Sequence, residues 1–308
     1  MNASGPQIAY FITPHGFGHG ARAAACMVAL DARIPHIGWH IFTQVPEWFF
    51  GASGIATASY HALATDVGLV QCSPWEADMA ATLALLEALL PFRPQQVAAL
   101  AETVKAASCR LIICDIAALG IAVARKAGLP AVLVENFTWD WIYAPHVGTH
   151  PQIGAFGQIL AQWYARADHH IQAAPWCASP PAPPDLQTGP VSRPAGRSRD
   201  AIRRALKIPK NHRLLLVTMG GVPDRHERRL KSIGLNRISL VIPGNHPQVI
   251  GSGALIRLPY HSRFYHPDLI QAADAVVGKA GYSTLAEVYR AGVPFGYIAR
   301  DNFRESAV

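Results

Sequence analysis

The feature that most constrains this chain lies near its end, where a strand pattern, a glycine turn and a helix pattern follow one another. The apolar, β-branched run at 275–277 stops at Gly278 and Gly281, and a helical pattern begins at Ser283. A turn of this kind lets a phosphate approach the backbone, where the N–H groups and positive dipole end of the helix can hold it. The pattern therefore predicts a βα unit with a candidate anion site, and Glu287, one turn into the helix, could reach a pair of ribose hydroxyls.

A second unit of the same kind opens the chain. The apolar strand pattern at 8–12 runs into the loop Thr-Pro-His-Gly-Phe-Gly-His-Gly at 13–20, and a strong helix-former follows at 21–30. The loop glycines are spaced G-x-G-x-G, which differs from the G-x-G-x-x-G of dinucleotide folds, and no acidic residue ends a following strand at the expected ribose position. The chain also lacks a P-loop motif, so a nicotinamide enzyme and a P-loop nucleotidase are both disfavoured.

Two histidines are the unusual feature of that first loop. His15 and His19 follow the first strand at its carboxyl end, where open α/β sheets bind ligands. A neutral imidazole there could accept a proton from a hydroxyl near pH 7, although a loop histidine can equally cap backbone groups. Asp115, at the end of the strand 111–115, could orient a histidine or cap the next helix. Asn136 likewise follows a strand and is a candidate to line the same edge.

The rest of the sequence alternates strand and helix patterns, which predicts parallel sheets with helices on both faces. Trp139, Trp141 and Tyr143 could stack on an acceptor or belong to the core. Further strands are expected at 38–43, 131–135, 213–219, 239–242, 254–258 and 295–298, helices at 76–90, 94–107, 116–127, 200–206 and 269–273, and a short strand pair or loop at 60–71.

Length, proline content and charge divide the chain into two parts. We expect an N-terminal domain at 1–178, a proline-rich extended linker at 179–198 and a C-terminal domain at 199–308. Residues 1–190 carry 8 Lys/Arg and 12 Asp/Glu, a net charge of −4, whereas residues 191–308 carry 19 and 8, a net charge of +11, and the sum is the overall +7. The basic half is therefore the better place for a phosphate-bearing ligand.

Composition also narrows the partners and the compartment. No motif typical of nucleic-acid binding accompanies the positive charge, so no nucleic-acid partner is expected. No apolar run reaches the about 18 residues that a membrane helix needs, although the basic half is compatible with peripheral binding to anionic lipids. The 5 cysteines form no C-x-x-C pair and resemble buried thiols of a reducing compartment, which predicts a cytoplasmic protein without a cysteine-bound metal.

The motif Gly-Lys-Ala-Gly-Tyr-Ser-Thr at 278–284, followed by Glu287 and by Ala-Gly-Val-Pro at 291–294, is similar to the donor-binding signature of GT-B glycosyltransferases. It most resembles the peptidoglycan N-acetylglucosaminyltransferase (family 28) group and the glycosyltransferase-like domains fused to arabinokinase. The loop Pro-His-Gly-Phe-Gly-His-Gly-Ala-Arg at 14–22 also resembles the kinase-fused group. The resemblance implies two Rossmann-like, doubly wound domains facing a cleft, with the second domain truncated at its C-terminus.

The resemblance also implies roles for individual residues. His19 would be base or orienter, with His15 and Asp115 beside it. The nucleobase would lie near Phe264 and Tyr265, and Glu305 would bind the donor sugar. Gly220, Gly221, Gly281, Ser283 and Thr284 would hold the diphosphate and Glu287 the ribose; Gly18, Arg22 and Asn136 complete the candidate substrate contacts.

These observations favour an enzyme that transfers a sugar from a nucleotide diphosphate donor, expected to be a UDP-sugar, to a hydroxyl acceptor. A hexosyl transfer without metal or other cofactor is expected, because helix dipoles and basic side chains can offset the charge of the leaving diphosphate. The absence of a D-x-D motif agrees with this hypothesis. The alternatives are a nucleotide-sugar-binding module of the same fold without turnover and, less favoured, a sugar-nucleotide epimerase.

Overall fold

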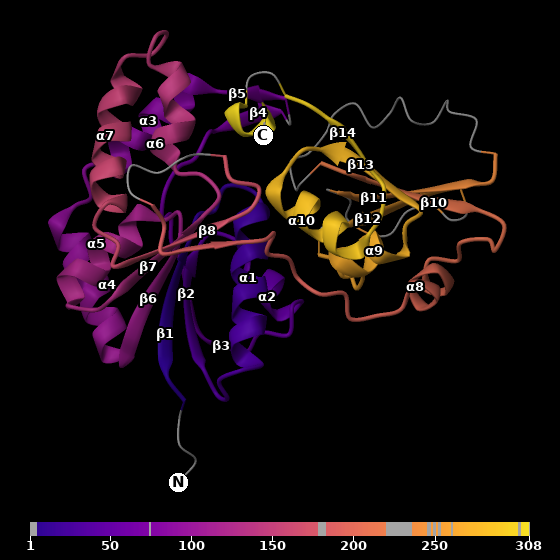
Figure 1. Ribbon diagram of the computed structural model, residues 1–308, viewed down its shortest axis with the longest axis horizontal. Coiled ribbons are helices and arrows are strands. Elements are labelled where there is room, and N and C mark those ends of the chain that lie inside the picture. The colour runs from indigo at the N-terminus through magenta and orange to yellow at the C-terminus, as the bar shows by residue number, and fades with distance from the viewer. Residues whose placement is uncertain are drawn as a thin grey trace. The chain divides into compact units, whose positions relative to one another are not determined.

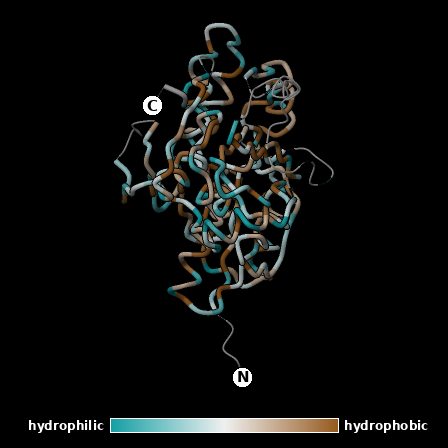
Figure 2. The backbone as a smooth tube through the Cα atoms, turned by 90° about the vertical axis from the view of Figure 1, so that its right-hand side faces the viewer, coloured by the Kyte–Doolittle hydropathy of each residue, from teal (hydrophilic) through white to brown (hydrophobic). Residues whose placement is uncertain are grey.

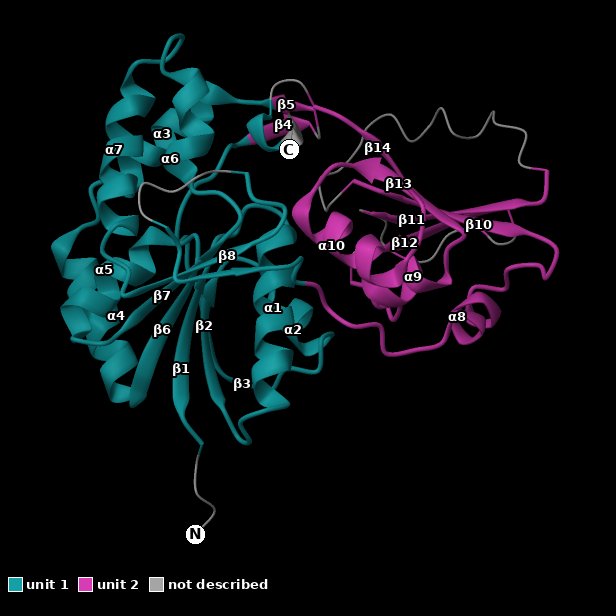
Figure 3. Cartoon of the chain, in the orientation of Figure 1, with its two compact units in different colours: residues 1–70, 77–191, 303–308 teal, residues 71–76, 192–302 magenta. Residues whose placement is uncertain are grey.

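The computed structural model describes residues 5–73, 75–177, 183–219, 236–244, 248, 251, 254–259, 261–300 and 303–307. The chain divides into two compact units (Figure 3). Residues 1–70, 77–191 and 303–308 form the first unit, and residues 71–76 and 192–302 form the second. The change from one to the other at 191–192 falls within the stretch expected to be a linker.

The first unit is built on a parallel sheet. Its strands are β1 (Gln7–Ile12), β2 (Gly38–Thr43), β3 (Thr57–Ala62), β6 (Cys109–Asp115), β7 (Ala131–Glu135), β8 (His169–Ala173) and β9 (Leu186–Thr188). Among the described residues they form a 7-stranded sheet in the order β3-β2-β1-β6-β7-β8-β9. The register aligns Ile8 with Trp39 on one side and with Leu111 on the other. The order runs outward from β1 in both directions, as a doubly wound fold requires.

Helices cover both faces of this sheet. They are α1 (Gly18–Asp31), α2 (Glu47–Gly51), α3 (Met79–Leu89), α4 (Pro94–Ala106), α5 (Ala118–Ala127), α6 (Trp139–Tyr143) and α7 (Gln152–Tyr164), with short 3-10 turns η1 (Ala144–His146) and η3 (Arg304–Ala307). Figure 1 shows α1 and α2 on one side of the sheet and α4 and α5 on the other. Ala9 and Phe11 pack in the cluster under α4 and α5, whereas Ile8, Tyr10 and Ile12 pack in the cluster under α1. The continuous apolar run of β1 is explained because successive side chains point to opposite, equally covered faces.

The second unit repeats the design on a smaller scale. Its strands are β10 (Arg213–Thr218), β11 (Ile238–Gly244), β12 (Leu255–Pro259), β13 (Ala275–Lys279) and β14 (Phe295–Ile298), and its helices are α8 (Arg199–Ala205), α9 (His266–Ala272) and α10 (Tyr282–Ala291). In the described part the strands form a 5-stranded parallel sheet in the order β12-β11-β10-β13-β14. Leu214, Leu216 and Val276 pack against α8, α9 and α10 in one core. A further small sheet pairs β4 (Gln71–Ser73) with β5 (Glu76–Ala77).

Several expected helix starts are corrected by the structure. Helix α1 begins at Gly18 and not at 21, so the second histidine of the loop lies in its first turn. Helix α3 begins at Met79 and not at 76, because the Asp78 side chain accepts the N–H of Ala81 as its cap. Helix α5 begins at Ala118 and not at 116, since Ile116 has a positive φ of 45° that no helix accommodates.

Two further corrections concern the edges of the elements. Helix α9 begins at His266 and not at 269, with a proline in its first turn, where proline is tolerated. The stretch 60–71, expected as a short strand pair or loop, is a loop at 63–70 between the end of β3 and the start of β4, and β3 lies at the edge of the main sheet. Part of the proline-rich stretch likewise forms β9, which pairs with β8.

Hydrophobic and hydrophilic segments are interspersed along the backbone (Figure 2). Among the described residues no helix combines the length and the apolar character needed to cross a membrane. Peripheral association with anionic lipids stays a prediction.

Candidate functional site

The first candidate site lies where the first sheet reverses its order, between β1 and β6. Helix α1 follows β1 onto one face of the sheet and α5 follows β6 onto the other, so the carboxyl ends of these two strands are the place where such folds bind ligands. His19 and Arg22 lie in the first two turns of α1, and Asp115 is the last residue of β6. We call these three residues the first-unit cluster.

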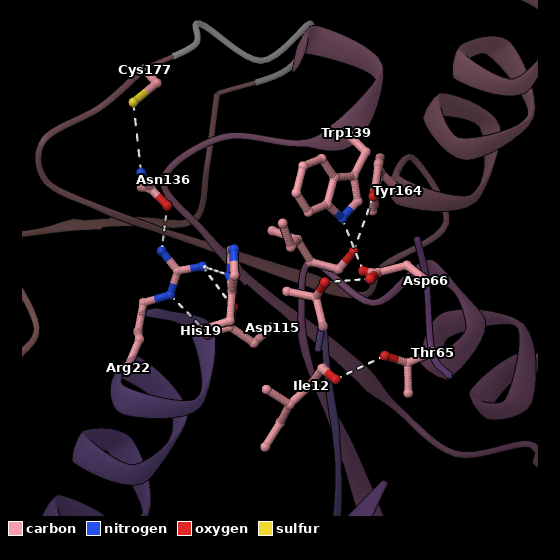
Figure 4. A network of polar contacts seen from close by, with 12 residues as sticks. Ile12, His19, Arg22, Thr65, Asp66, Asp115, Asn136, Trp139, Tyr164 and Cys177 are labelled. Carbon is pink, nitrogen blue, oxygen red and sulfur yellow. Dashed lines mark hydrogen bonds and ion pairs between the residues drawn. The ribbon is translucent and has the colours of Figure 1, made fainter. Parts of the chain in front are cut away.

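The members of the first-unit cluster are bonded directly to one another (Figure 4). The Nδ1 atom of His19 lies 2.8 Å from Oδ1 of Asp115. Arg22 donates from Nε to Oδ2 and from Nη2 to Oδ1 of Asp115, each at 2.7 Å, in the two-pronged geometry that suits a carboxylate. Asp115 therefore orients the histidine, and helix α5 has Ala117 at its N-cap with no side-chain cap bond.

Asn136 extends the cluster from the end of β7. Its Oδ1 accepts a hydrogen bond of 2.5 Å from Nη1 of Arg22, which assigns the direction of its amide. The amide nitrogen then faces Sγ of Cys177 at 3.6 Å. Burial raises the pKa of the Cys177 thiol to about 11, so this sulfur is a packing atom and not a nucleophile near neutral pH.

Burial and pairing set the charges in the first-unit cluster. Burial lowers the pKa of His19 from its ordinary value, and the neighbouring Asp115 only partly opposes this effect. Burial by itself would raise the pKa of Asp115, but the charge of Arg22 and the hydrogen bond from His19 outweigh this effect. The pKa of this carboxyl is therefore lowered. Asp115 is thus an anion beside a neutral histidine. A carboxylate can only accept hydrogen bonds, so Nδ1 carries the proton and Nε2 is left able to take one.

His15 lies beside this cluster and not within it. Its ring meets the indole of Trp139 edge-on, with 5.2 Å between ring centroids. The ring of His19 lies 6.0 Å from the same indole. Trp139 and Tyr143 are buried in the core of the first unit. Of the two roles expected for these aromatics, the structure therefore supports core packing over stacking on an acceptor.

The second candidate site is the turn between β13 and α10. A Cβ at Gly278 would lie 2.1 Å from the carbonyl oxygen of Thr218, so only glycine allows β10 and β13 to approach this closely. Gly281 is the N-cap of α10, and a Cβ there would meet open space. Ser283 is half-buried and Thr284 is buried in the first turn of the helix. The backbone N–H groups in the first turn of a helix can receive an anion.

Glu287 is a paired and buried carboxylate, with 3% of its surface exposed. Its Oε1 accepts 2.9 Å contacts from Nε and Nη2 of Arg193, and its Oε2 lies 2.8 Å from Nδ1 of His266. Although burial opposes ionisation, Arg193 and His266 lower the pKa of Glu287. We call Arg193, His266 and Glu287 the second-unit cluster. No motif in the sequence pointed to Arg193, which lies 94 residues from its partner.

A pocket of about 270 Å³ lies beside the second-unit cluster. It is lined by Arg193, Pro194, Ala195, Pro267, Gln271, Glu287, Arg290 and Ala291. The ring of Tyr265 lies 5.0 Å from the guanidinium carbon of Arg193 and is half-buried. Phe264, the other residue expected near a nucleobase, is buried among the core residues of this unit.

The remaining expected contacts are dispersed. Gly18 opens helix α1. Glu305 is half-buried in η3, which belongs to the first unit. Gly220 and Gly221 lie outside the described residues. Within the described ranges, no group of three or more His, Cys, Asp or Glu side chains is placed to hold a metal ion.

We compared the chain with protein-family models and with known proteins. No protein-family model matches the chain. The chain is 27% identical over 308 residues to L-arabinokinase of Arabidopsis thaliana, an alignment that covers 96% of this chain and 28% of that protein. The chain thus spans little more than a quarter of the length of this curated relative.

Solved glycosyltransferases have the same fold. A UDP-glucosyltransferase from Polygonum tinctorium superposes with a TM-score of 0.61 at 15% identity, covering 100% of this chain and 83% of that one. Phytolacca americana UGT2, solved with UDP-2fluoro-glucose and pterostilbene, superposes with a TM-score of 0.60 at 14% identity. The superposition covers 98% of this chain and 82% of that one. SsfS6 from Streptomyces sp. SF2575 superposes with a TM-score of 0.59 at 13% identity, covering 98% of this chain and 84% of that one. With its two Rossmann-like parallel sheets, the chain has a GT-B glycosyltransferase fold.

Proposed function

We propose that this protein transfers a sugar from a nucleoside diphosphate donor, UDP-sugar by preference, to a hydroxyl acceptor. The observation that carries the proposal is the His19–Asp115 pair at the carboxyl edge of the first sheet, in a chain with a GT-B fold. A sugar acceptor hydroxyl needs a base, and a neutral histidine whose second nitrogen is held by a carboxylate is suited to that task.

In this mechanism His19 acts through Nε2. It accepts the proton of the acceptor hydroxyl as the oxygen attacks the anomeric carbon, and the bond from that carbon to the diphosphate breaks. Asp115 holds Nδ1 and stabilises the imidazolium that forms. Arg22 keeps Asp115 ionised and in place.

The second unit is the proposed donor site. The N-terminus of α10, with Gly281, Ser283 and Thr284 in or before its first turn, would receive the diphosphate through backbone N–H groups. Helix dipoles and the arginines of this basic unit would offset the developing charge, so a hexosyl transfer without metal is proposed. Gly220 and Gly221 remain candidate phosphate contacts.

One observation favours the second candidate, a nucleotide-sugar-binding module without turnover. Both oxygens of Glu287, which the resemblance assigns to the ribose, are already bonded to Arg193 and His266. A ribose would have to share or displace these partners. The two candidates make different predictions for turnover by the wild-type chain.

The deciding experiment is UDP release from UDP-glucose and UDP-N-acetylglucosamine with a panel of hydroxyl acceptors, measured beside UDP binding by calorimetry. The His19→Ala variant should lose about 100-fold or more of turnover and bind UDP unchanged. His169→Ala is the matched control, because His169 is an exposed histidine at the start of β8. UDP binding without turnover in the wild-type chain would favour the module, and undiminished turnover in His19→Ala would remove the proposed base.

A further inference from the structure

A loop at 63–70 closes over the carboxyl end of β1, beside the two histidines. The hydroxyl of Thr65 donates to the carbonyl of Ile12 at 2.8 Å, and the hydroxyl of Tyr143 donates to the carbonyl of Gly68 at 2.8 Å. Gly68 has a φ of 70°, and a Cβ there would lie 2.6 Å from Nδ1 of His15. The loop therefore lies against the end of the strand and against the His15 ring.

Asp66 is the polar centre of this loop, and only 5% of it is exposed. One carboxylate oxygen accepts the hydroxyl of Thr13, the residue after β1, and the other accepts the indole N–H of Trp139 at 2.9 Å (Figure 4). Because both oxygens are used, the carboxylate fixes the position of the indole relative to the end of β1.

The indole held by Asp66 is the surface on which both histidines pack. The ring centroid of His15 lies 5.2 Å from that of Trp139, and the centroid of His19 lies 6.0 Å from it. The indole also stacks on Tyr143, with 6.0 Å between the ring centroids. A displacement of the indole would thus change the position of the His19 ring and the direction of its Nε2 atom.

We propose that Asp66 is a positioning residue for the sugar transfer, fixing Trp139 against His19 through one hydrogen bond and tying it to the end of β1 through the other. This inference rests on the proposed function for its catalytic consequence. The geometric part, that Asp66 sets the environment of the His19 ring, stands on the contacts alone.

The ionisable groups around Asp66 add a second property. Burial raises the pKa of Asp66 to about 7, with the bonds from Thr13 and Trp139 opposing this effect and the charge of Asp115 adding to it. The pKa values of Tyr143 and Tyr164 are raised by their own burial and by the charge of Asp66. These tyrosines stay neutral near pH 7, whereas the charge of the Asp66 carboxyl changes around neutrality.

The test uses two substitutions at one position and a partner substitution. In Asp66→Asn the amide can accept the indole N–H and donate to Thr13, whose hydroxyl can rotate to accept it, so both bonds are kept. Asp66→Ala removes both bonds, and Trp139→Phe removes the indole donor. Transfer from a UDP-sugar is measured for each variant and for Asp66→Ala combined with Trp139→Phe.

We expect Asp66→Ala to lower kcat by about 10- to 100-fold with the KM for the donor unchanged, and Asp66→Asn to restore kcat to within about 3-fold. The double variant should lose less than the product of the two single losses, because both remove the same bond. The proposal is overturned if Asp66→Ala keeps its kcat, or if Asp66→Asn fails to restore it while remaining folded.

A second readout does not depend on activity. The ring resonances of His15 and His19, followed by NMR between pH 5 and pH 8, should shift in Asp66→Ala and in Trp139→Phe. Asp31→Asn is the matched control, because Asp31 also accepts an indole N–H, from Trp39 at 2.8 Å, but lies at the exposed far end of α1. If the wild-type chain transfers no sugar, the proposed function fails while this titration still decides the role of Asp66; unchanged His19 resonances in both variants would refute it.

Discussion

The two units of the molecule contain the same three kinds of side chain in different arrangements. Each has a buried carboxylate held by an arginine and a histidine: Asp115, Arg22 and His19 in the first-unit cluster, and Glu287, Arg193 and His266 in the second-unit cluster. In the first, the carboxylate ends a strand and both partners come from one turn of α1. In the second, the carboxylate lies on α10 and its partners come from two other segments.

The difference shows what each arrangement can do. In the first-unit cluster the carboxylate fixes one nitrogen of the histidine on a rigid strand end, which leaves the other nitrogen for chemistry. In the second-unit cluster one nitrogen of His266 is likewise bonded to the carboxylate, but the other lies 3.4 Å from the hydroxyl oxygen of Thr218, and the arginine lines a pocket. The first arrangement is suited to moving a proton, and the second to joining the segment before α8 to α9 and α10.

The largest expected effect comes from breaking the first-unit cluster at its centre. Asp115→Ala removes the carboxylate that balances the charge of Arg22, whose side chain is buried with 1% of its surface exposed. We expect the free energy of unfolding of the first unit to fall by about 3–5 kcal/mol. Urea denaturation followed by circular dichroism measures this loss, with Asp31→Ala, an exposed carboxylate on the helix that carries Arg22, as the control. A loss below about 1 kcal/mol would mean that solvent reaches Arg22.

Breaking the second-unit cluster in the same way should cost less. Glu287→Ala leaves Arg193 without its carboxylate, but the adjoining pocket of about 270 Å³ can admit water to the guanidinium. The expected loss in unfolding free energy is about 1–3 kcal/mol. The same variant also tests the role of Glu287 in binding. If the free energy of UDP binding falls by more than the free energy of unfolding, Glu287 is assigned to the ribose.

The pH dependence of stability should separate Asp66 from the two clusters. The folded-state pKa of Asp66, about 7, exceeds the ordinary value of 3.8. Above pH 4 the folded chain therefore holds a proton that the unfolded chain has lost, so this group's contribution to stability decreases as the pH rises from 4 to 7. Relative to wild type, Asp66→Asn should gain about 2–4 kcal/mol between these limits.

For the two cluster carboxyls, the contribution to stability changes with pH in the opposite direction. The pKa values of Asp115 and Glu287 are lowered in the folded state, so their contribution is present at neutral pH and lost as the pH falls into the acid range. Thermal unfolding of wild type and Asp66→Asn across pH 4 to 8 measures the difference directly. A constant difference between the two proteins over this range would contradict the assignment to Asp66.

The smallest effect is expected at the rim of the second-unit pocket. Arg290 lines the same pocket as Arg193 but is exposed, and no ion pair joins it to another described residue. Arg290→Ala should change the unfolding free energy by less than about 0.5 kcal/mol, whereas Arg193→Ala should exceed this several-fold. Equal effects of the two substitutions in urea denaturation would show that the buried pair with Glu287 contributes little.

The sequence was sufficient for the elements and for part of the candidate site. Apolar runs and glycine turns predicted the strands and the βα alternation, because these patterns depend on local periodicity. They also singled out His19 and Asp115 from their places after strands, whereas Arg22 was a candidate only through the resemblance of its loop to that of the kinase-fused group. Helix starts were less accurate, since capping by Asp78 and the backbone of Ile116 decided them.

Tertiary structure alone decided which of these side chains meet. Strand order and register bring Arg22 to Asp115 across 93 residues, and the fold of the second unit brings Arg193 to Glu287 across 94. Asp66 became visible only through its bonds to Thr13 and Trp139. The physical reason is that periodicity assigns a residue to an element and a face, whereas a hydrogen bond needs two atoms within about 3 Å, a distance set by the packing of the whole unit.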